Sequence, residues 1–283
     1  MTIKKSSTRS AWKKNLYENK GYPDNYTDAS FLEELKKNVH SRGVSYGEAI
    51  RGGGLVARQL CIVVWFALIF VYVNNEWITP EKVFVCSSIL TGIGYLLFRA
   101  VHTSVNYSTV FWGDLHTVLI FLSFGYVLSP ILKTLTETIS TDTIYAMTTI
   151  MSCVHLIFFD YGVPAAVVSS ALSLNAAIFG SICLASRLPS PFHAFVLLTV
   201  AVELYALLPM LLSNVRGSLI TVGSMVTVTV YFLFTVSSIL TFLFICSVIF
   251  ITAVCPLCFV KWQCHKDNIY GPWDEAVVSE IDM

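Results

Sequence analysis

Residues 219–260 decide the fold class, because they read LITVGSMVTVTVYFLFTVSSILTFLFICSVIFITAVCPLCFV without one charged side chain. A continuous helix over these 42 residues would be about 63 Å long, roughly twice the hydrocarbon thickness of a bilayer. The small and polar cluster at residues 235–238 (TVSS) lies near the middle and favours a turn there. The stretch therefore predicts a hairpin of two membrane-spanning helices.

The rest of the chain has a similar character. Hydrophobic residues make up 55% of it and charged residues 13%, with a mean hydropathy of +0.68, which is too apolar for a water-soluble protein. Apolar runs in a bilayer must form helices, since a helix satisfies its own backbone. We expect an all-α, polytopic transmembrane helix bundle over residues 55–260 with eight spans, near 55–73, 83–98, 115–132, 143–159, 163–184, 192–212, 219–236 and 238–260.

The two ends of the chain are polar. Of the 18 Lys and Arg residues, 11 fall within the first 58 positions, and we expect no cleavable signal peptide before the first apolar run. With both termini cytosolic, that face carries 15 basic residues against three on the other. We therefore expect a cytosolic arm (1–54) and a cytosolic tail (261–283). Two glycosylation sequons, at Asn25 and Asn106, then lie on the cytosolic side.

The arm contains one candidate interaction element. A short amphipathic helix is expected to open near Asp28 or Ser30, with Phe31, Leu32 and Leu35 on one face and the charged residues 33, 34, 36 and 37 on the other. This pattern suits a helix on a membrane surface or a partner protein, and equally an ordinary solvated helix.

Titratable side chains near the third and fourth spans are the first candidate functional groups. Lys133 and Glu137 have the spacing of a helical ion pair, and Asp142 is placed to cap the next helix. Glu137 and Asp142 also form a candidate pair of catalytic carboxylates, but neither a nucleophile nor a metal-ligand set adjoins them. Helix termini and interhelical hydrogen bonds are the favoured interpretation.

Three more titratable groups follow along the chain. Glu203 lies inside a predicted span, either as a lipid-headgroup or proton site or, as we favour, as a hydrogen-bonded structural carboxyl group. His155 and Asp160 offer an acid and a base, but five residues along a helix place them on different faces. A histidine among Val, Leu and Ile is more often an interhelical hydrogen-bond partner.

The predicted fifth span, 163–184, is rich in Ala, Ser and Gly. Small residues allow helix backbones to approach closely. We expect this helix in the middle of the bundle or at a subunit interface, after a tight hairpin around Pro164.

Cysteines and short motifs restrict the chemistry. Cys255, Cys258, Cys264 and His265 have metal-like spacing, but a second ligand pair is missing, so juxtamembrane thiols open to acylation are favoured. The sequence has no Gly-rich phosphate loop, His-Glu-x-x-His motif or DxD-type acidic pair. We expect no catalytic residue, cofactor or metal in this chain.

Seven strings carry a resemblance to a known family: 23–26 (PDNY), 31–35 (FLEEL), 132–137 (LKTLTE), 140–147 (STDTIYAM), 155–162 (HLIFFDYG), 183–189 (CLASRLP) and 271–276 (GPWDEA). In this order they resemble the phosphatidylinositol-glycan class C (PIG-C) family, from about residue 12 to 276. The loop from Arg99 to Gly113 departs most from the family pattern.

The resemblance implies a non-catalytic membrane component of an endoplasmic reticulum complex. That complex transfers N-acetylglucosamine from its uridine diphosphate sugar to phosphatidylinositol on the cytosolic face, the first step of glycosylphosphatidylinositol (GPI) anchor synthesis. The glycosyltransferase chemistry belongs to a separate class A subunit, and classes H, P, Q and Y complete the assembly. We expect this chain to scaffold the complex and present the lipid, with Trp273, Asp274 and the Phe31–Leu35 helix contacting partners.

Two other functions remain open at this point. The first is an intramembrane lipid-modifying enzyme built on four acidic residues, Glu137, Asp142, Asp160 and Glu203. The second is a lipid transporter or scramblase, which would show matching halves with corresponding helix breaks. The breaks at Pro130, Pro164 and Pro209 are not placed symmetrically.

Overall fold

The computed structural model describes residues 22–23, 26, 36–37, 43–101, 107–162, 168–213, 219–266 and 269–270. The chain divides into two units, which we describe separately. The larger comprises residues 45–260, and the smaller combines residues 1–44 with residues 261–283.

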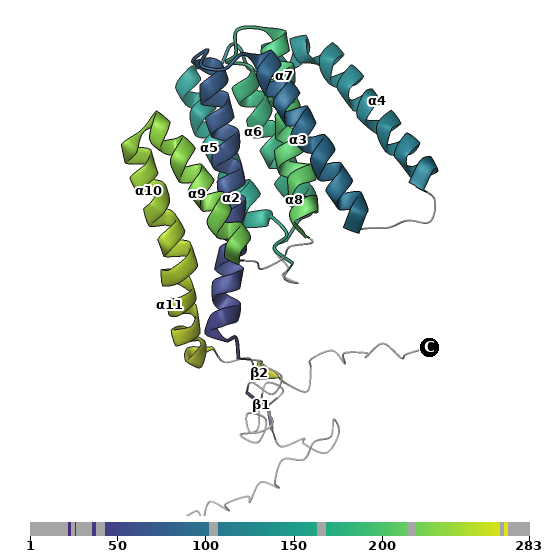
Figure 1. Ribbon diagram of the computed structural model, residues 1–283. Helices are drawn as coiled ribbons and strands as arrows, with labels where there is room; N and C mark the ends of the chain where they lie inside the picture. Colours follow the sequence, from purple (N-terminus) through teal and green to yellow (C-terminus); the bar gives the residue numbers. More distant parts are fainter. Residues whose placement is uncertain are drawn as a thin grey trace, which may run out of the picture. The chain divides into compact units, whose positions relative to one another are not determined.

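The larger unit is built from helices (Figure 1). In chain order they are α2 (Tyr46–Asn74), α3 (Pro80–Val101), α4 (Tyr107–Thr134), α5 (Thr141–Phe158), α6 (Ser170–Ala185), α7 (Pro191–Val202), the π-turn η1 (Glu203–Leu207), α8 (Leu208–Leu212), α9 (Leu219–Val236), α10 (Ser238–Ile249), the π-turn η3 (Phe250–Val254) and α11 (Cys255–Trp262). The last two residues of α11 and the 3₁₀ turn that follows it, η4 (Gln263–His265), belong to the smaller unit.

Six helical segments among the described residues are long and apolar enough to cross a membrane. They are Tyr46–Asn74, Pro80–Val101, Phe111–Thr134, Pro191–Leu212, Leu219–Val236 and Ser238–His265. Neither α5, with 18 residues, nor the shorter apolar helix α6, with 16, is among them. The predicted helical, polytopic membrane architecture is confirmed, whereas the number of crossings is not decided by these criteria.

The hairpin predicted over residues 219–260 is present. After α9 ends at Val236, the N–H of Ser237 donates to the Leu233 carbonyl (2.9 Å). The Ser237 hydroxyl then accepts from the N–H of Leu240 (3.4 Å) and caps α10. The turn therefore falls within residues 235–238, as predicted.

The predicted fifth span was wrong at its start. Helix α6 begins only at Ser170, because Ser169 has an extended backbone (φ −143°) and its hydroxyl caps the N–H of Leu172 (3.4 Å). The Ser169 N–H donates to the Phe158 carbonyl at the end of α5 (3.1 Å), which ties the two helix ends together. Residues 163–167 lie outside the described part of the chain.

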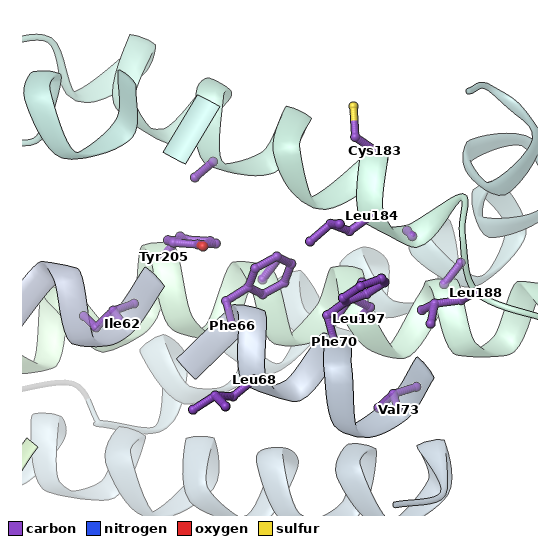
Figure 2. Packing of buried hydrophobic residues seen from close by; sticks show 14 of the residues in the cluster. Ile62, Phe66, Leu68, Phe70, Val73, Cys183, Leu184, Leu188, Leu197 and Tyr205 are labelled. Atoms are coloured by element: carbon purple, nitrogen blue, oxygen red, sulfur yellow. The ribbon is translucent and has the colours of Figure 1, made fainter. Parts of the chain in front are cut away.

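Helix α2 is the centre of the bundle. Half of its most apolar window is buried, against none of that of α3, so α3 is the more peripheral helix. Figure 2 shows Phe66 and Phe70 of α2 pointing toward Leu184 of α6 and Leu197 of α7. On another side, Trp65 Nε1 donates to the Thr229 hydroxyl (2.7 Å) and fastens α9 to α2.

Two prolines each follow a π-turn. Proline lacks an N–H, so Pro209 and Pro256 cannot complete the regular helical ladder. In the turn before each proline, the hydrogen bonds become i→i+5: the N–H of Leu208 donates to the Glu203 carbonyl, and the N–H of Cys255 to the Phe250 carbonyl. The helices therefore continue past both prolines with one widened turn.

The smaller unit joins the two ends of the chain. Strand β1 (Lys36–Lys37) pairs antiparallel with β2 (Ile269–Tyr270), with Lys36 opposite Tyr270. The N–H of Val44 donates to the Gln263 side-chain oxygen (3.2 Å). The predicted arm helix was therefore wrong at Lys36 and Lys37, where pairing with the tail satisfies the backbone instead. Its remaining residues, including Phe31, Leu32 and Leu35, lie outside the described residues, as do Trp273 and Asp274.

Candidate functional site

A buried polar network connects three helices of the bundle. Nε2 of Gln59 on α2 lies 2.7 Å from Nε2 of His155 on α5. On the other side of the imidazole, Nδ1 lies 3.0 Å from the carbonyl oxygen of Ser173 on α6 and 2.9 Å from its hydroxyl. The three residues are at most 2% exposed, so this contact is sealed from the surroundings.

The hydrogen-bond partners of the imidazole fit one tautomer. The Gln59 amide nitrogen can only donate, so Nε2 of His155 must accept and Nδ1 carries the proton toward the Ser173 carbonyl. The Ser173 hydroxyl in turn donates to the His155 carbonyl (3.0 Å). His155 therefore bonds to residues of two other helices of the bundle.

Aromatic rings pack around the imidazole of His155. The ring of Tyr205, in the π-turn η1, stands edge-on to His155 at 4.9 Å between centroids and lies 5.3 Å from Phe66 of α2. Phe159 covers the imidazole from the end of α5 at 5.6 Å. Water and a substrate are thus excluded from His155, which argues against its use as a general acid or base.

Glu203 occupies the first position of the same π-turn but faces another helix. Its half-buried carboxyl group interacts with the side chains of Ser87 and Thr91 on α3. The widened turn thereby presents Glu203 to α3 and Tyr205 to the His155 network within three residues. Single π-turns occur frequently at functional sites, and this one joins the peripheral α3 to the centre of the bundle.

A second polar cluster joins the turn after α4 to the turn after α6. The Arg187 guanidinium donates from Nε to the Ser186 hydroxyl (3.1 Å), from Nη1 to the Ile139 carbonyl (3.0 Å), and from Nη2 to the Thr136 carbonyl. The Thr136 hydroxyl also donates to the Ser186 hydroxyl (2.7 Å). Nearby, Nζ of Lys133 donates to the Pro189 carbonyl (3.0 Å).

These contacts correct two predictions. Helix α4 ends at Thr134, so Lys133 and Glu137 do not share a helix, and Lys133 bonds a carbonyl instead of forming the predicted ion pair. Helix α5 is capped by the Ser140 hydroxyl, which accepts from the N–H of Thr143 (3.4 Å). Asp142 is not the cap; it is an exposed residue in the first helical turn, where a carboxylate complements the helix dipole.

Asp160 is separate from His155. It lies beyond the end of α5, is exposed, and its Oδ1 accepts from the N–H of Gly162 (2.7 Å). Gly162 has φ 80°, which favours glycine. The candidate acid and base are therefore not brought together, and Asp160 instead shapes the chain after α5.

The structure adds residues that the sequence interpretation missed. Gln59, Ser173 and Tyr205 complete the His155 network, and Gly53 allows α2 to approach η3, since a Cβ there would lie 2.6 Å from the Ile251 carbonyl oxygen. A glutamine within an apolar run and three consecutive glycines, residues 52–54, are the signals that could have identified two of them.

Metal coordination finds no support in the described residues. Within them, no three His, Cys, Asp or Glu side chains come close enough together to hold a metal ion. The contacts of His155 with Gln59 and Ser173 instead join different helices, an arrangement that holds helices in register and orientation.

Comparison with known proteins identifies the family. The GPI2 family, described as phosphatidylinositol N-acetylglucosaminyltransferase, matches residues 12–274. The C subunits of phosphatidylinositol N-acetylglucosaminyltransferase from Homo sapiens and Bos taurus are each 43% identical over 279 residues, which cover 95% of this chain and 93% of theirs. The GPI2 subunit of Schizosaccharomyces pombe is 28% identical over 94% of this chain and 86% of its own. No solved structure matches significantly.

The match extends from the arm to the tail and includes every helix of the bundle, in agreement with the resemblance carried by the seven sequence strings. This chain belongs to the PIG-C/GPI2 family.

Proposed function

We propose that this protein is the class C membrane subunit of the complex that transfers N-acetylglucosamine from UDP-N-acetylglucosamine to phosphatidylinositol, the first step of GPI-anchor biosynthesis. The observation that carries the proposal is 43% identity, across 95% of the chain, to proteins named as the C subunit of this transferase. Identity over nearly the whole length favours the same place in the same assembly.

The protein itself is non-catalytic in this proposal. Its four candidate carboxyl groups are dispersed: Glu137 and Asp142 lie near the start of α5, Asp160 lies beyond its end, and Glu203 faces α3 from η1. A glycosyl transfer needs groups that converge on one reacting centre. The class A subunit therefore supplies the chemistry, and this chain supplies the membrane scaffold.

We place the protein in the endoplasmic reticulum membrane with eight crossings and both termini cytosolic. The close approach of Gly53 to Ile251 and Pro256 supports an even number of crossings, since the beginning of α2 lies beside the final helix. With an even number of crossings, the first helix begins and the last helix ends on the same side of the membrane. Helices α5 and α6 would be the fourth and fifth crossings, held together by His155 and Ser173.

The arm and the tail are the proposed docking surface for the class A subunit. Pairing of β1 with β2 shows that both ends of the chain form one unit, which supports a joint surface. We propose Phe31, Leu32 and Leu35 from the arm and Trp273 and Asp274 from the tail as contacts. The class H, P, Q and Y subunits complete the assembly, and phosphatidylinositol would enter a groove at the cytosolic boundary of the bundle.

Co-purification with activity measurement tests this proposal. A tagged copy, purified in mild detergent, should bring a glycosyltransferase subunit with it, and the eluate should transfer N-acetylglucosamine to phosphatidylinositol. Substitution of Trp273 and Asp274 by alanine should reduce recovery of the class A subunit, whereas Ser279→Ala, in the same tail, serves as the matched control.

The opposite results are equally clear. If the chain purifies alone and is active, the intramembrane enzyme built on the four acidic residues replaces the scaffold. Movement of labelled lipid across vesicles that contain only this chain would instead support a transporter or scramblase. Unchanged recovery of the class A subunit with the Trp273 and Asp274 variants would remove the docking surface.

A further inference from the structure

The end of the final helix carries a group of thiols that the proposed function does not use. Three of the eight cysteines, Cys255, Cys258 and Cys264, fall within ten positions of one another. Cys255 and Cys264 are exposed and Cys258 is partly exposed, whereas Cys61 and Cys183 are buried in the bundle. The exposed thiols near the chain end are thus open to reagents.

Cys264 differs from the other cysteines by its neighbour. Its Sγ lies 3.1 Å from Nδ1 of His265 and 3.2 Å from the Lys261 carbonyl oxygen. In the described part of the chain, no other cysteine has an imidazole bonded to its sulfur. A thiol within hydrogen-bond reach of an imidazole is the arrangement that activates a sulfur nucleophile, because the base removes the proton as the sulfur attacks.

The position of Cys264 and His265 near the end of α11 indicates which class of compound would react with the thiol. Trp262 is 66% exposed at the end of α11, and Lys261 precedes it. Trp and Lys at the end of an apolar helix are typical of the membrane–water interface, where the indole and the lysine stem contact lipid and the polar ends contact water. Cys264 therefore lies close to the level at which a fatty acyl chain can enter the bilayer.

We propose that Cys264 is a site of S-acylation by a long-chain fatty acyl thioester of coenzyme A. The sulfur of Cys264 attacks the thioester carbonyl, a new S–C bond forms, and the C–S bond to coenzyme A breaks. The thiol proton passes through Nδ1 of His265 to the departing sulfur, which leaves as free coenzyme A thiol. No oxidation or reduction occurs, and the acyl chain anchors the tail in the cytosolic leaflet. The proposal rests on the cytosolic placement of the tail given above.

Acyl exchange on the full chain in membranes of expressing cells is the test. Free thiols are blocked, thioesters are cleaved with hydroxylamine, and the released thiols are tagged with maleimide-polyethylene glycol, so that each acylated cysteine gives one shift on a gel. We expect a single hydroxylamine-dependent shift that disappears in Cys264→Ser. Cys86→Ser is the matched control, because Cys86 is also exposed but lies within α3. His265→Gln should slow acyl incorporation by roughly tenfold or more, the usual contribution of a positioned base.

Two results would overturn the assignment: no hydroxylamine-dependent shift in the wild-type chain, or a shift that persists in Cys264→Ser. Peptide mass spectrometry on the wild-type tail gives the same answer without any variant, which covers the case of a variant that does not accumulate. Transfer of N-acetylglucosamine, assayed on the same membranes, reports on the proposed function separately from the acyl group.

Discussion

Gln59 and His155 lie 96 positions apart in the chain, yet their Nε2 atoms are 2.7 Å apart in the buried interior. Because the imidazole also bonds Ser173, one side chain fixes the relative positions of α2, α5 and α6. None of these groups has an alternative partner in water or lipid, so the network specifies how the three helices face one another.

The first prediction concerns this pair. Gln59→Leu and His155→Leu should each lower the stability by about 1–3 kcal/mol, because each leaves a polar partner unsatisfied in an apolar interior. The double variant should cost less than the sum, since both partners are then removed. Thermal unfolding in detergent, followed by size-exclusion chromatography, measures this; strictly additive losses would show that the two side chains do not interact.

The second prediction uses two adjacent glycines of α2. Gly53→Ala should destabilise the protein by about 1–3 kcal/mol, since its Cβ would lie 2.6 Å from the Ile251 carbonyl oxygen and backbone must move. Gly52→Ala is the control: nothing lies within 4 Å of its Cβ position, and alanine should stabilise the helix by about 0.5–1 kcal/mol. Opposite shifts of the melting temperature are expected, and equal shifts would contradict the close helix crossing.

The third prediction concerns Glu203. Glu203→Gln keeps a polar side chain beside Ser87 and Thr91 and should be tolerated, whereas Glu203→Leu should loosen α3 by about 0.6–1.7 kcal/mol, the usual contribution of a polar contact between membrane helices. Hydrogen exchange along α3 measures the effect. Glu81→Gln, at an exposed position in the first turn of α3, is the control. If Gln disrupts activity while exchange in α3 stays unchanged, the carboxyl group has a chemical role and not a structural one.

The fourth prediction concerns Arg187. A lysine cannot reproduce the three donors that reach Ser186, Ile139 and Thr136, so Arg187→Lys should cost about 1–3 kcal/mol although the charge is kept. Lys133→Arg retains a donor for the Pro189 carbonyl and should be nearly neutral. Limited proteolysis of the turns after α4 and α6 follows the change; full protection in Arg187→Lys would mean that charge alone holds the turns.

The fifth prediction tests the proposed topology. The sequons at Asn25 and Asn106 should remain unmodified, because the proposed topology puts both on the cytosolic side. A glycosylatable loop inserted between Thr138 and Ile139 should be modified, since that turn would face the lumen. Endoglycosidase treatment of the expressed chain separates the cases on a gel, and a glycan at Asn25 would reverse the orientation of the arm.

Hydropathy anticipated the helical elements well because burial of apolar side chains in a bilayer depends on composition and length. The 219–260 hairpin and its turn followed from the length of one uncharged run. The small residues of the fifth predicted span likewise indicated close packing, and the Cβ of Met151 on α5 lies 3.4 Å from the Cβ position of Gly180 on α6. Helix ends were less predictable: serine caps and one Ser169–Phe158 hydrogen bond set where α5 ends and α6 begins.

The sequence by itself determined the membrane class, the positions of most helices and, through strings spread along the chain, the family. Only the tertiary structure decided that His155 meets Gln59 and Ser173, that Lys133 bonds Pro189 and not Glu137, and that Lys36 pairs with Tyr270. The reason is physical. Whether a run of residues forms a membrane helix depends on its own length and composition. A hydrogen bond between distant residues depends on how two elements are rotated and shifted against each other.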